Sequence, residues 1–439
     1  MDAAGTVARG DLLVRDGAIA ALGDAVPAAL RELPRGRAEE SYDASGALVL
    51  PGLIQGHLHL CQTLFRGLAE QDDLLRWLRE SIWPLEAAHT PASLAASARL
   101  GLCELIASGV TCINDMGTVR HTEVLGEVME SAGVRAVFGK ALMDQGRGVP
   151  RALLDDTGAA LDEALAIAAR FDGAGGGRLR VSLAPRFILS CSPELWEGVT
   201  AASRARSLLV HTHLAESPSE GREVEAAVAT TAARWFAARG VLGPRFVGAH
   251  GVWLAGDELE AIRAADAALV HCPGSNLKLG SGLAPVRAWL DAGVRRGIGC
   301  DGAACSNRLD PFHEMGLAAG VSRVRDPGRS LAARDIVALA TCEGARALGL
   351  GAVAGTLASG RPADLAVVDV GGPHHGPEPG ADPYAALVHA ARASDVRLTM
   401  VEGRVLYRDG AWTTLDPGAA LAEARAERQG LLRRVERAA

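Results

Sequence analysis

The feature that most constrains the fold is an alternation of apolar runs with helical segments through the middle of the chain. The apolar runs are ALVLPGLIQGHLHL, GVTCINDM, VRAVFGKALM, RLRVSLAPRF, SLLVHTHLAE, RFVGAHGVWL, AALVHCPGSN and VRRGIGCDGA. Segments such as PASLAASARLGLCELIASG and PELWEGVTAASRAR lie between them and are predicted helices. Strands that alternate with helices form a parallel sheet. Eight such units therefore predict an α/β protein with a closed (β/α)8 barrel over residues 51–354.

The two ends of the chain have a different pattern. Short β-like pieces separated by turns, namely DLLVRDGAIAAL, ADLAVVDV, LTMVEGRVLY and RDGAWTT, occupy both ends. Neither end is long enough for a sheet domain of its own, so residues 1–50 and 355–415 predict one small composite β domain. Residues 416–439 predict a charged C-terminal helix, either exposed to solvent or in contact with another subunit. Within the Pro/Gly-rich surface loop predicted over 371–383, we expect His374 and His375 to be exposed.

Charge and cysteine usage exclude several classes of function. The formal net charge is −7, and no run of Lys or Arg is long enough to follow a phosphate backbone, which argues against nucleic acid and anionic membranes as partners. The segment MDAAGTVARGDLLV lacks the profile of a signal peptide. The 8 cysteines form no CxxC pair, as is typical of reduced thiols. We therefore expect a cytoplasmic enzyme.

Histidines follow several predicted strands at the point where each strand ends. His57 and His59 are two positions apart, so in a strand their side chains share one face. The others are His211 and His213 in the fifth run, His250 in the sixth and His271 in the seventh, with Asp301 in the eighth. Buried polar groups need partners, and imidazole and carboxylate suit zinc or iron. The pattern therefore favours a catalytic metal site over unrelated buried histidines.

The segments that carry these residues resemble the amidohydrolase superfamily. They are HLH after PGLI, HTHLAES, GAH, HCPGSNLKLGSG and GCDGAACSN. They are similar to the mononuclear branch of purine deaminases, first to deaminases of S-adenosylhomocysteine, methylthioadenosine and 5′-deoxyadenosine, then to guanine deaminases. The likeness runs from about residue 10 to 410 and implies a (β/α)8 barrel with a β-sandwich built from both termini. DLLVRDGAIAAL resembles the second strand of that sandwich, so the first strand is either absent or truncated.

The resemblance implies a ligand set and catalytic roles. One divalent ion, Zn²⁺ or Fe²⁺, would be held by His57, His59, His213 and Asp301. Asp301 would also accept a proton from the attacking water, Glu216 would protonate the ring nitrogen beside the reacting carbon, and His250 would bond the developing oxygen. We expect His211 and His271 to neighbour this site, and Ser275 and Asn276 to shape a loop.

Five further residues are expected at the substrate. Glu86 matches the acidic position that grips ribose hydroxyls in related nucleoside deaminases, or is an exposed helix carboxylate. Trp83, like Trp77, either forms an aromatic wall or packs in the core. The positions at which guanine deaminases bond the polar edge of the purine are matched by Gln62, Arg186 and Phe187.

These residues predict a metal-dependent aminohydrolase that converts an adenine nucleoside to its inosine analogue and releases ammonia. GCDGAACSN and SNLKLGSGLAPV follow the adenine-nucleoside form. A guanine or 8-oxoguanine deaminase, an s-triazine hydrolase and a catalytically inactive barrel scaffold are the alternatives. The expected partner is a small-molecule purine, and the sequence leaves open whether the chain forms a homo-oligomer.

Overall fold

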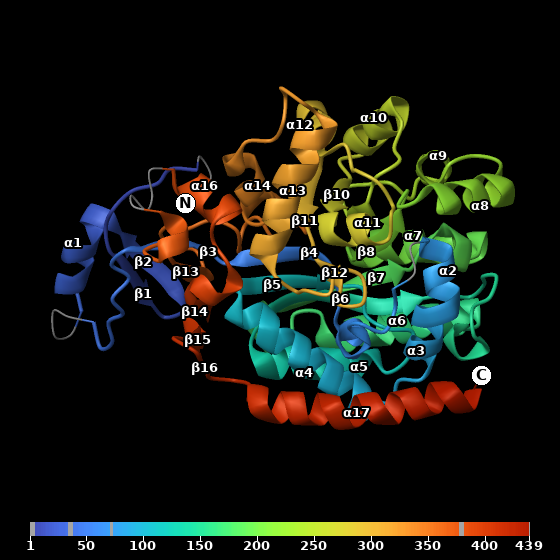
Figure 1. Ribbon diagram of the computed structural model, residues 1–439, viewed down its shortest axis with the longest axis horizontal. Helices are drawn as coiled ribbons and strands as arrows, with labels where there is room; N and C mark the ends of the chain where they lie inside the picture. Colours follow the sequence, from blue (N-terminus) through green and yellow to red (C-terminus); the bar gives the residue numbers. More distant parts are fainter. Residues whose placement is uncertain (1–4, 34–37, 71–72, 377–381, 439) are drawn as a thin grey trace.

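A parallel barrel forms the centre of the protein, as the computed structural model shows over residues 5–33, 38–70, 73–376 and 382–438 (Figure 1). Its strands, in spatial order, are β4 (Leu53–His59), β5 (Val110–Asp115), β6 (Arg135–Leu142), β7 (Leu179–Pro185), β8 (Leu209–Leu214), β9 (Phe246–His250), β10 (Ala268–His271), β11 (Arg295–Ile298) and β12 (Asp301–Gly302). Since β11 and β12 are two halves of one strand and β12 pairs with β4, the sheet closes. The predicted (β/α)8 barrel is confirmed.

The last barrel strand is split at Gly299 and Cys300, and the split positions Asp301. A Cβ at Gly299 would lie 2.5 Å from the carbonyl oxygen of His57, so only glycine fits there. The Cys300 N–H donates to Gln55 Oε1 at 2.8 Å, which satisfies a donor that the interrupted ladder would leave unpaired. Asp301 then pairs with Leu58, beside the two histidines of β4.

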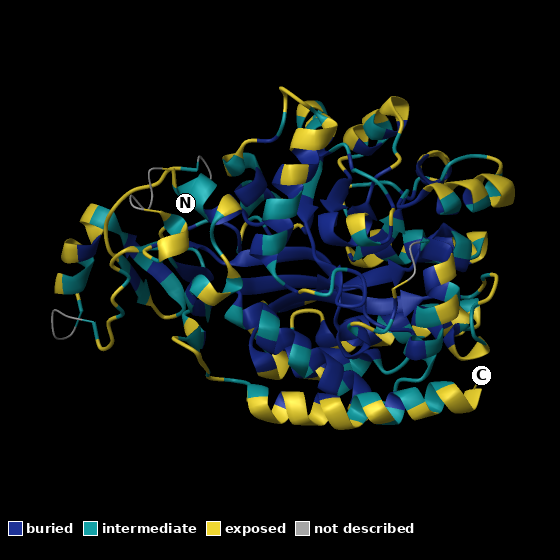
Figure 2. Cartoon of the chain, in the orientation of Figure 1, coloured by how far each residue is buried: buried dark blue, intermediate teal, exposed yellow. Residues whose placement is uncertain are grey.

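Helices surround the barrel, and half of those named here begin at a side-chain cap. Ser192 Oγ accepts from the Leu195 N–H at the start of α7 (Pro193–Arg206), which spans the helix predicted there. The remaining helices of the barrel and its loops are α2 (Leu74–Trp77), α3 (Trp83–Ala87), α4 (Pro91–Ala107), α5 (Thr122–Ala132), α6 (Thr157–Phe171), α8 (Pro218–Val228), α9 (Ala232–Ala238), α10 (Gly256–Ala264), α11 (Pro273–Lys278), α12 (Val286–Ala292), α13 (Pro311–Arg325), α14 (Ala333–Leu339) and α15 (Cys342–Ala347). Figure 2 shows the barrel strands as the most buried part of the chain.

An antiparallel sheet beside the barrel draws strands from both ends of the chain (Figure 1). Its order is β16 (Ala411–Trp412), β15 (Arg404–Arg408), β14 (Val396–Val401), β13 (Leu365–Asp369) and β3 (Ala47–Pro51). The first predicted strand run is therefore two strands in different sheets. It breaks at Gly52, where a Cβ would lie 2.0 Å from Thr111 Oγ1. DLLVRDGAIAAL forms the hairpin of β1 (Leu12–Arg15) and β2 (Ala18–Leu22), followed by α1 (Val26–Arg31).

A buried ion pair joins the two sheets. Arg135, at the start of β6, donates through Nε to Asp364 Oδ2 at 2.8 Å, and Asp364 directly precedes β13. The same guanidinium reaches Glu402 Oε1 at 3.0 Å. This network fixes the antiparallel sheet against the amino-terminal ends of the barrel strands.

The last helix, α17 (Pro417–Ala438), packs on its own chain along α4 (Figure 1). Ala420, Ala424 and Leu431 are its buried residues, and Arg434 Nε donates to the Ala88 carbonyl at 2.7 Å. The other face of α17 is exposed (Figure 2). Among the helices that the structure describes, none combines the length and the apolar character needed to cross a bilayer.

Candidate metal centre and active site

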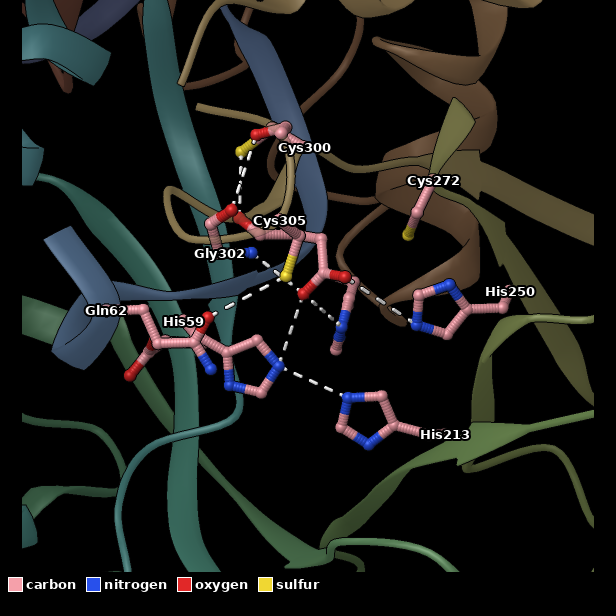
Figure 3. Close-up of polar contacts among 12 residues, drawn as sticks. His59, Gln62, His213, His250, Cys272, Cys300, Gly302 and Cys305 are labelled. Atoms are coloured by element: carbon pink, nitrogen blue, oxygen red, sulfur yellow. Dashed lines mark hydrogen bonds and ion pairs between the residues drawn. The ribbon is translucent and has the colours of Figure 1, made fainter. Parts of the chain in front are cut away.

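Four side chains from three strands converge at the carboxyl ends of the barrel strands. His57 and His59 come from β4, His213 from β8 and Asp301 from β12, and their ligand atoms all lie within 4.8 Å of one another. Figure 3 shows the rings of His59 and His213 facing each other through their Nε2 atoms, and His59 Nε2 also contacts Asp301 Oδ1. The structure thus brings together all four residues predicted to bind the metal.

The spacing of these atoms fits one tetrahedral metal ion. Asp301 Oδ1 lies 3.4 Å from His57 Nε2 and 3.3 Å from His59 Nε2, and the Nε2 atoms of His59 and His213 are 3.2 Å apart. Ligands bonded to zinc at their usual lengths lie about 3.3 Å from one another. His57 Nε2 is buried and makes no hydrogen bond among the described residues. A cation held between the four ligand atoms would supply the partner that His57 Nε2 lacks.

Two neighbouring groups orient the imidazoles. His213 Nδ1 lies 2.7 Å from the carbonyl oxygen of Arg186, so it donates there and leaves the Nε2 lone pair facing the other ligands. His57 Nδ1 lies 2.8 Å from His211 Nε2, which places His211 behind the ligand, as expected. These contacts set the ring orientations that a metal site requires.

Burial sets the protonation of the ligands. It lowers the pKa of His57, His59 and His213, so the imidazoles are neutral near pH 7. Burial also acts to raise the pKa of Asp301, but the imidazole of His57, 3.4 Å away, and the neighbouring rings hold that pKa well below its ordinary value. Three neutral imidazoles and one carboxylate form a typical donor set for zinc or iron.

Glu216 and His250 lie beside this cluster. His250 Nε2 is 3.4 Å from Glu216 Oε2 and 3.8 Å from Asp301 Oδ2. Burial, and then the charge of Asp301, raise the pKa of Glu216 well above its ordinary value, as is typical of groups that transfer protons. His250 and Asp301 have left-handed φ angles of 76° and 58°, a strained backbone that concentrates at functional sites.

Asn276 contacts His250, although from the sequence we expect it only to shape a loop. His250 Nδ1 lies 2.9 Å from Asn276 Oδ1, so Nδ1 carries the proton and the ring is held in place. The segment HCPGSN follows β10 and places Asn276 in α11, next to the end of β9. Sequence spacing could not reveal this contact, which depends on the turn that begins α11.

A cavity opens beside the cluster. Of the predicted substrate residues, Gln62, Arg186 and Phe187 line it, and Trp77 joins them. Trp83 is buried and lines instead a second cavity, which shares Phe187 with the first. Of the two tryptophans considered for an aromatic wall, Trp77 therefore lies at the first cavity and Trp83 does not.

Glu86 does not line the first cavity, because it lies behind two residues that do. Its Oε2 accepts from Arg186 Nη1 at 2.5 Å, and its Oε1 accepts from Arg186 Nη2 at 3.1 Å. Gln62 Nε2 also donates to Oε1, at 3.0 Å. Glu86 is thus neither an exposed helix carboxylate nor a free group facing the substrate space, and its contacts fix the orientation of Gln62 and Arg186.

Comparison with known proteins supports this description. Over 401 residues the chain is 39% identical to a 5-methylthioadenosine/S-adenosylhomocysteine deaminase of Natronomonas pharaonis, covering 91% of this chain and 90% of that protein. It is 36% identical over 415 residues to a 5′-deoxyadenosine deaminase of Methanothermobacter thermautotrophicus, covering 94% and 92%. An adenosine deaminase from Xanthomonas campestris, solved with bound zinc, superposes with a TM-score of 0.87 at 27% identity, covering 96% of this chain and 93% of that one.

The family assignment covers most of the chain. Residues 48–406 match the family described as the amidohydrolase family, and this range includes the barrel and most of the antiparallel sheet. The chain therefore belongs to the amidohydrolase family.

Proposed function

We propose that this protein is a metal-dependent aminohydrolase that deaminates an adenine nucleoside to the corresponding inosine analogue. The observation that carries the proposal is the convergence at one cavity of a metal-ligand set with Glu216, a buried carboxyl whose pKa is raised. The named activities of the curated relatives support the substrate class. Catalysis at the carboxyl ends of barrel strands is the rule for this fold.

His57, His59, His213 and Asp301 would hold the ion, and the zinc bound in the related adenosine deaminase favours zinc over iron. When bound, such an ion lowers the pKa of water and stabilises developing negative charge. The neutral imidazoles and the ionised Asp301 suit a cation, because they supply lone pairs without excess negative charge.

The surrounding side chains would move the protons. Asp301 is ionised and takes a proton from the attacking water. Glu216, whose pKa is raised, would give a proton to the ring nitrogen beside the amino-bearing carbon; it would then take the proton of the newly added hydroxyl and pass it to the amino group, which leaves as ammonia. His250, held through Nδ1 by Asn276, stabilises the developing oxygen through Nε2 when that atom is protonated.

One observation favours a second candidate, an oxopurine such as guanine or 8-oxoguanine. Arg186 and Gln62 line the cavity, whereas Glu86 is engaged with both of them behind its wall. A guanidinium that faces a base can donate to a carbonyl oxygen or a ring nitrogen. The edge of a purine that carries a carbonyl oxygen would therefore complement Arg186. The two candidates differ in which purine base lies against Arg186.

A substrate panel tests the proposal. Ammonia release would be measured, per bound metal, with adenosine, 5′-deoxyadenosine, methylthioadenosine, S-adenosylhomocysteine, guanine and 8-oxoguanine, with Glu216→Gln as the inactive control. We expect an adenine nucleoside to have the highest kcat/KM, by about tenfold or more, which corresponds to about 1.4 kcal/mol. A faster oxopurine would establish the second candidate. No ammonia from any of them with metal bound would contradict both and leave the s-triazine and scaffold alternatives.

A further inference from the structure

A second group of metal-binding side chains lies outside the barrel, at the connection between β13 and β14. His374 and His375 end a short 3-10 helix (Pro373–His375) that follows β13, and Asp395 ends another (Ala393–Asp395) directly before β14. Asp395 Oδ2 lies 2.9 Å from His374 Nε2 and 3.4 Å from His375 Nε2. The ligand atoms of all three residues lie within 4.8 Å of one another. Two imidazoles and a carboxylate thus converge on one point.

His375 is the residue that most needs a partner. The prediction that it is exposed is wrong, because its side chain is only 1% exposed, against 26% for His374. Neither ring nitrogen of His375 makes a hydrogen bond among the described residues. A buried polar atom without a partner costs free energy, so an unsatisfied imidazole that points at a carboxylate suggests a missing ligand.

The local backbone holds the three groups in place. The Arg392 N–H donates to Asp395 Oδ2 at 2.8 Å, which fixes the carboxylate. A Cβ at Gly372 would lie 2.9 Å from His374 Cε1, so glycine leaves room for the imidazole. The 3.4 Å between His375 Nε2 and Asp395 Oδ2 matches the distances in the barrel cluster, where Asp301 Oδ1 lies 3.3 and 3.4 Å from two imidazoles, whereas the 2.9 Å between His374 Nε2 and Asp395 Oδ2 is a hydrogen-bond distance.

We propose that His374, His375 and Asp395 bind a second divalent metal ion, of the kind that prefers imidazole and carboxylate ligands, namely zinc. Water would complete the coordination, because part of His374 reaches solvent. The ion would join the residues that follow β13 to those that precede β14. A link that closes a loop of this kind restricts the unfolded chain and so stabilises the folded one.

Metal content tests the proposal directly. Protein loaded with zinc and freed of loose ions by gel filtration would be measured by elemental analysis. We expect two zinc ions per wild-type chain, and one in each of His374→Ala, His375→Ala and the double variant His57→Ala/His59→Ala. His389→Ala removes an exposed imidazole from α16 (Pro383–His389) in the same connection and should keep both ions. One zinc ion in the wild type, or two in His374→Ala and His375→Ala, would overturn the proposal.

A thermal measurement separates this site from the barrel site. In the His57→Ala/His59→Ala background, added zinc should raise Tm by roughly a few degrees, because a ligand that binds only the folded state stabilises it. Adding His374→Ala, at a partly exposed position where folding is least at risk, should abolish the shift, and adding His389→Ala should preserve it. A shift that persists with His374→Ala would contradict the proposal. A deaminase proposal that failed on the substrate panel would leave these measurements unaffected.

Discussion

Glu86 and Arg186 lie 100 positions apart in the chain and form a buried ion pair in which each carboxylate oxygen accepts from a guanidinium nitrogen. The pair places Arg186 on the wall of the cavity and keeps Glu86 behind it. Removing one partner of a buried pair leaves the other charge without compensation, which costs far more than the pair contributes as a whole.

Glu86→Gln should therefore lower the free energy of unfolding by about 3–5 kcal/mol. Glu86→Gln/Arg186→Met should restore part of that loss, because it leaves no buried charge alone. Glu80→Gln, in an exposed pair with Arg76 at 3.0 Å, is the control and should cost less than about 1 kcal/mol. Urea unfolding of the four proteins measures these differences. Equal stabilities of Glu86→Gln and the control would show that the buried pair does not form in solution.

The same variant tests how Glu86 acts on the substrate. Because Glu86 orients Gln62 and Arg186, Glu86→Gln should raise KM for nucleosides and for free bases alike. Steady-state ammonia release with adenosine and with adenine or guanine measures both effects. A rise confined to nucleosides would instead indicate direct contact between Glu86 and the ribose hydroxyls.

Glu216→Gln should lower kcat by about 10²–10⁴-fold, because the glutamine has no proton to transfer. Metal content should remain at the wild-type level, since Glu216 is not among the four ligands. Elemental analysis and single-turnover measurements on the same preparation separate the two effects. Turnover within tenfold of the wild type would remove Glu216 from the proposed chemistry.

Glu314 should make stability fall as pH rises. Its Oε2 accepts from the Gly274 N–H at 2.9 Å, and burial raises its pKa from 4.5 to about 8. A carboxyl whose pKa is higher in the folded state stabilises that state fully below about pH 4.5, and this contribution is lost as pH rises through about 8. The loss amounts to at most about 5 kcal/mol. Glu314→Gln should gain stability relative to the wild type between pH 5 and 9 in urea unfolding, and parallel curves would contradict the prediction.

Arg135→Met tests how much the ion pair between the two sheets contributes to stability. It leaves Asp364 buried without its cation, so we expect a loss of about 3–5 kcal/mol in the free energy of unfolding. Arg170→Met, which breaks an exposed pair with Glu127, should cost less than about 1 kcal/mol. Similar urea midpoints for the two variants would show that the buried pair contributes no more to stability than the exposed pair.

Local pattern predicts much of this fold, because strand length and apolar periodicity are properties of short segments. The helix over 193–206 and the barrel strands follow from such patterns. These patterns do not show which sheet a given strand joins. The break at Gly52 depends on the approach of Thr111, and the break at Gly299 depends on the His57 backbone. Both are contacts between distant segments.

The candidate site, too, is predicted from the sequence only in part. The recurrence of polar residues near strand ends predicts a site at one end of the barrel, and the resemblance to the amidohydrolase superfamily selects His57, His59, His213 and Asp301 as its ligands. It does not show that Arg186 and Glu86 bond each other, or that Asn276 holds His250. Those contacts depend on where loops turn after the strands, which a residue pattern does not encode.

Metal content and turnover of His57→Ala and Asp301→Ala, measured together on folded protein, test the central claim most directly. Each variant should lose one equivalent of metal relative to the wild type, and ammonia release should fall by about 10³-fold or more. Wild-type metal content with undiminished turnover in both variants would contradict the account.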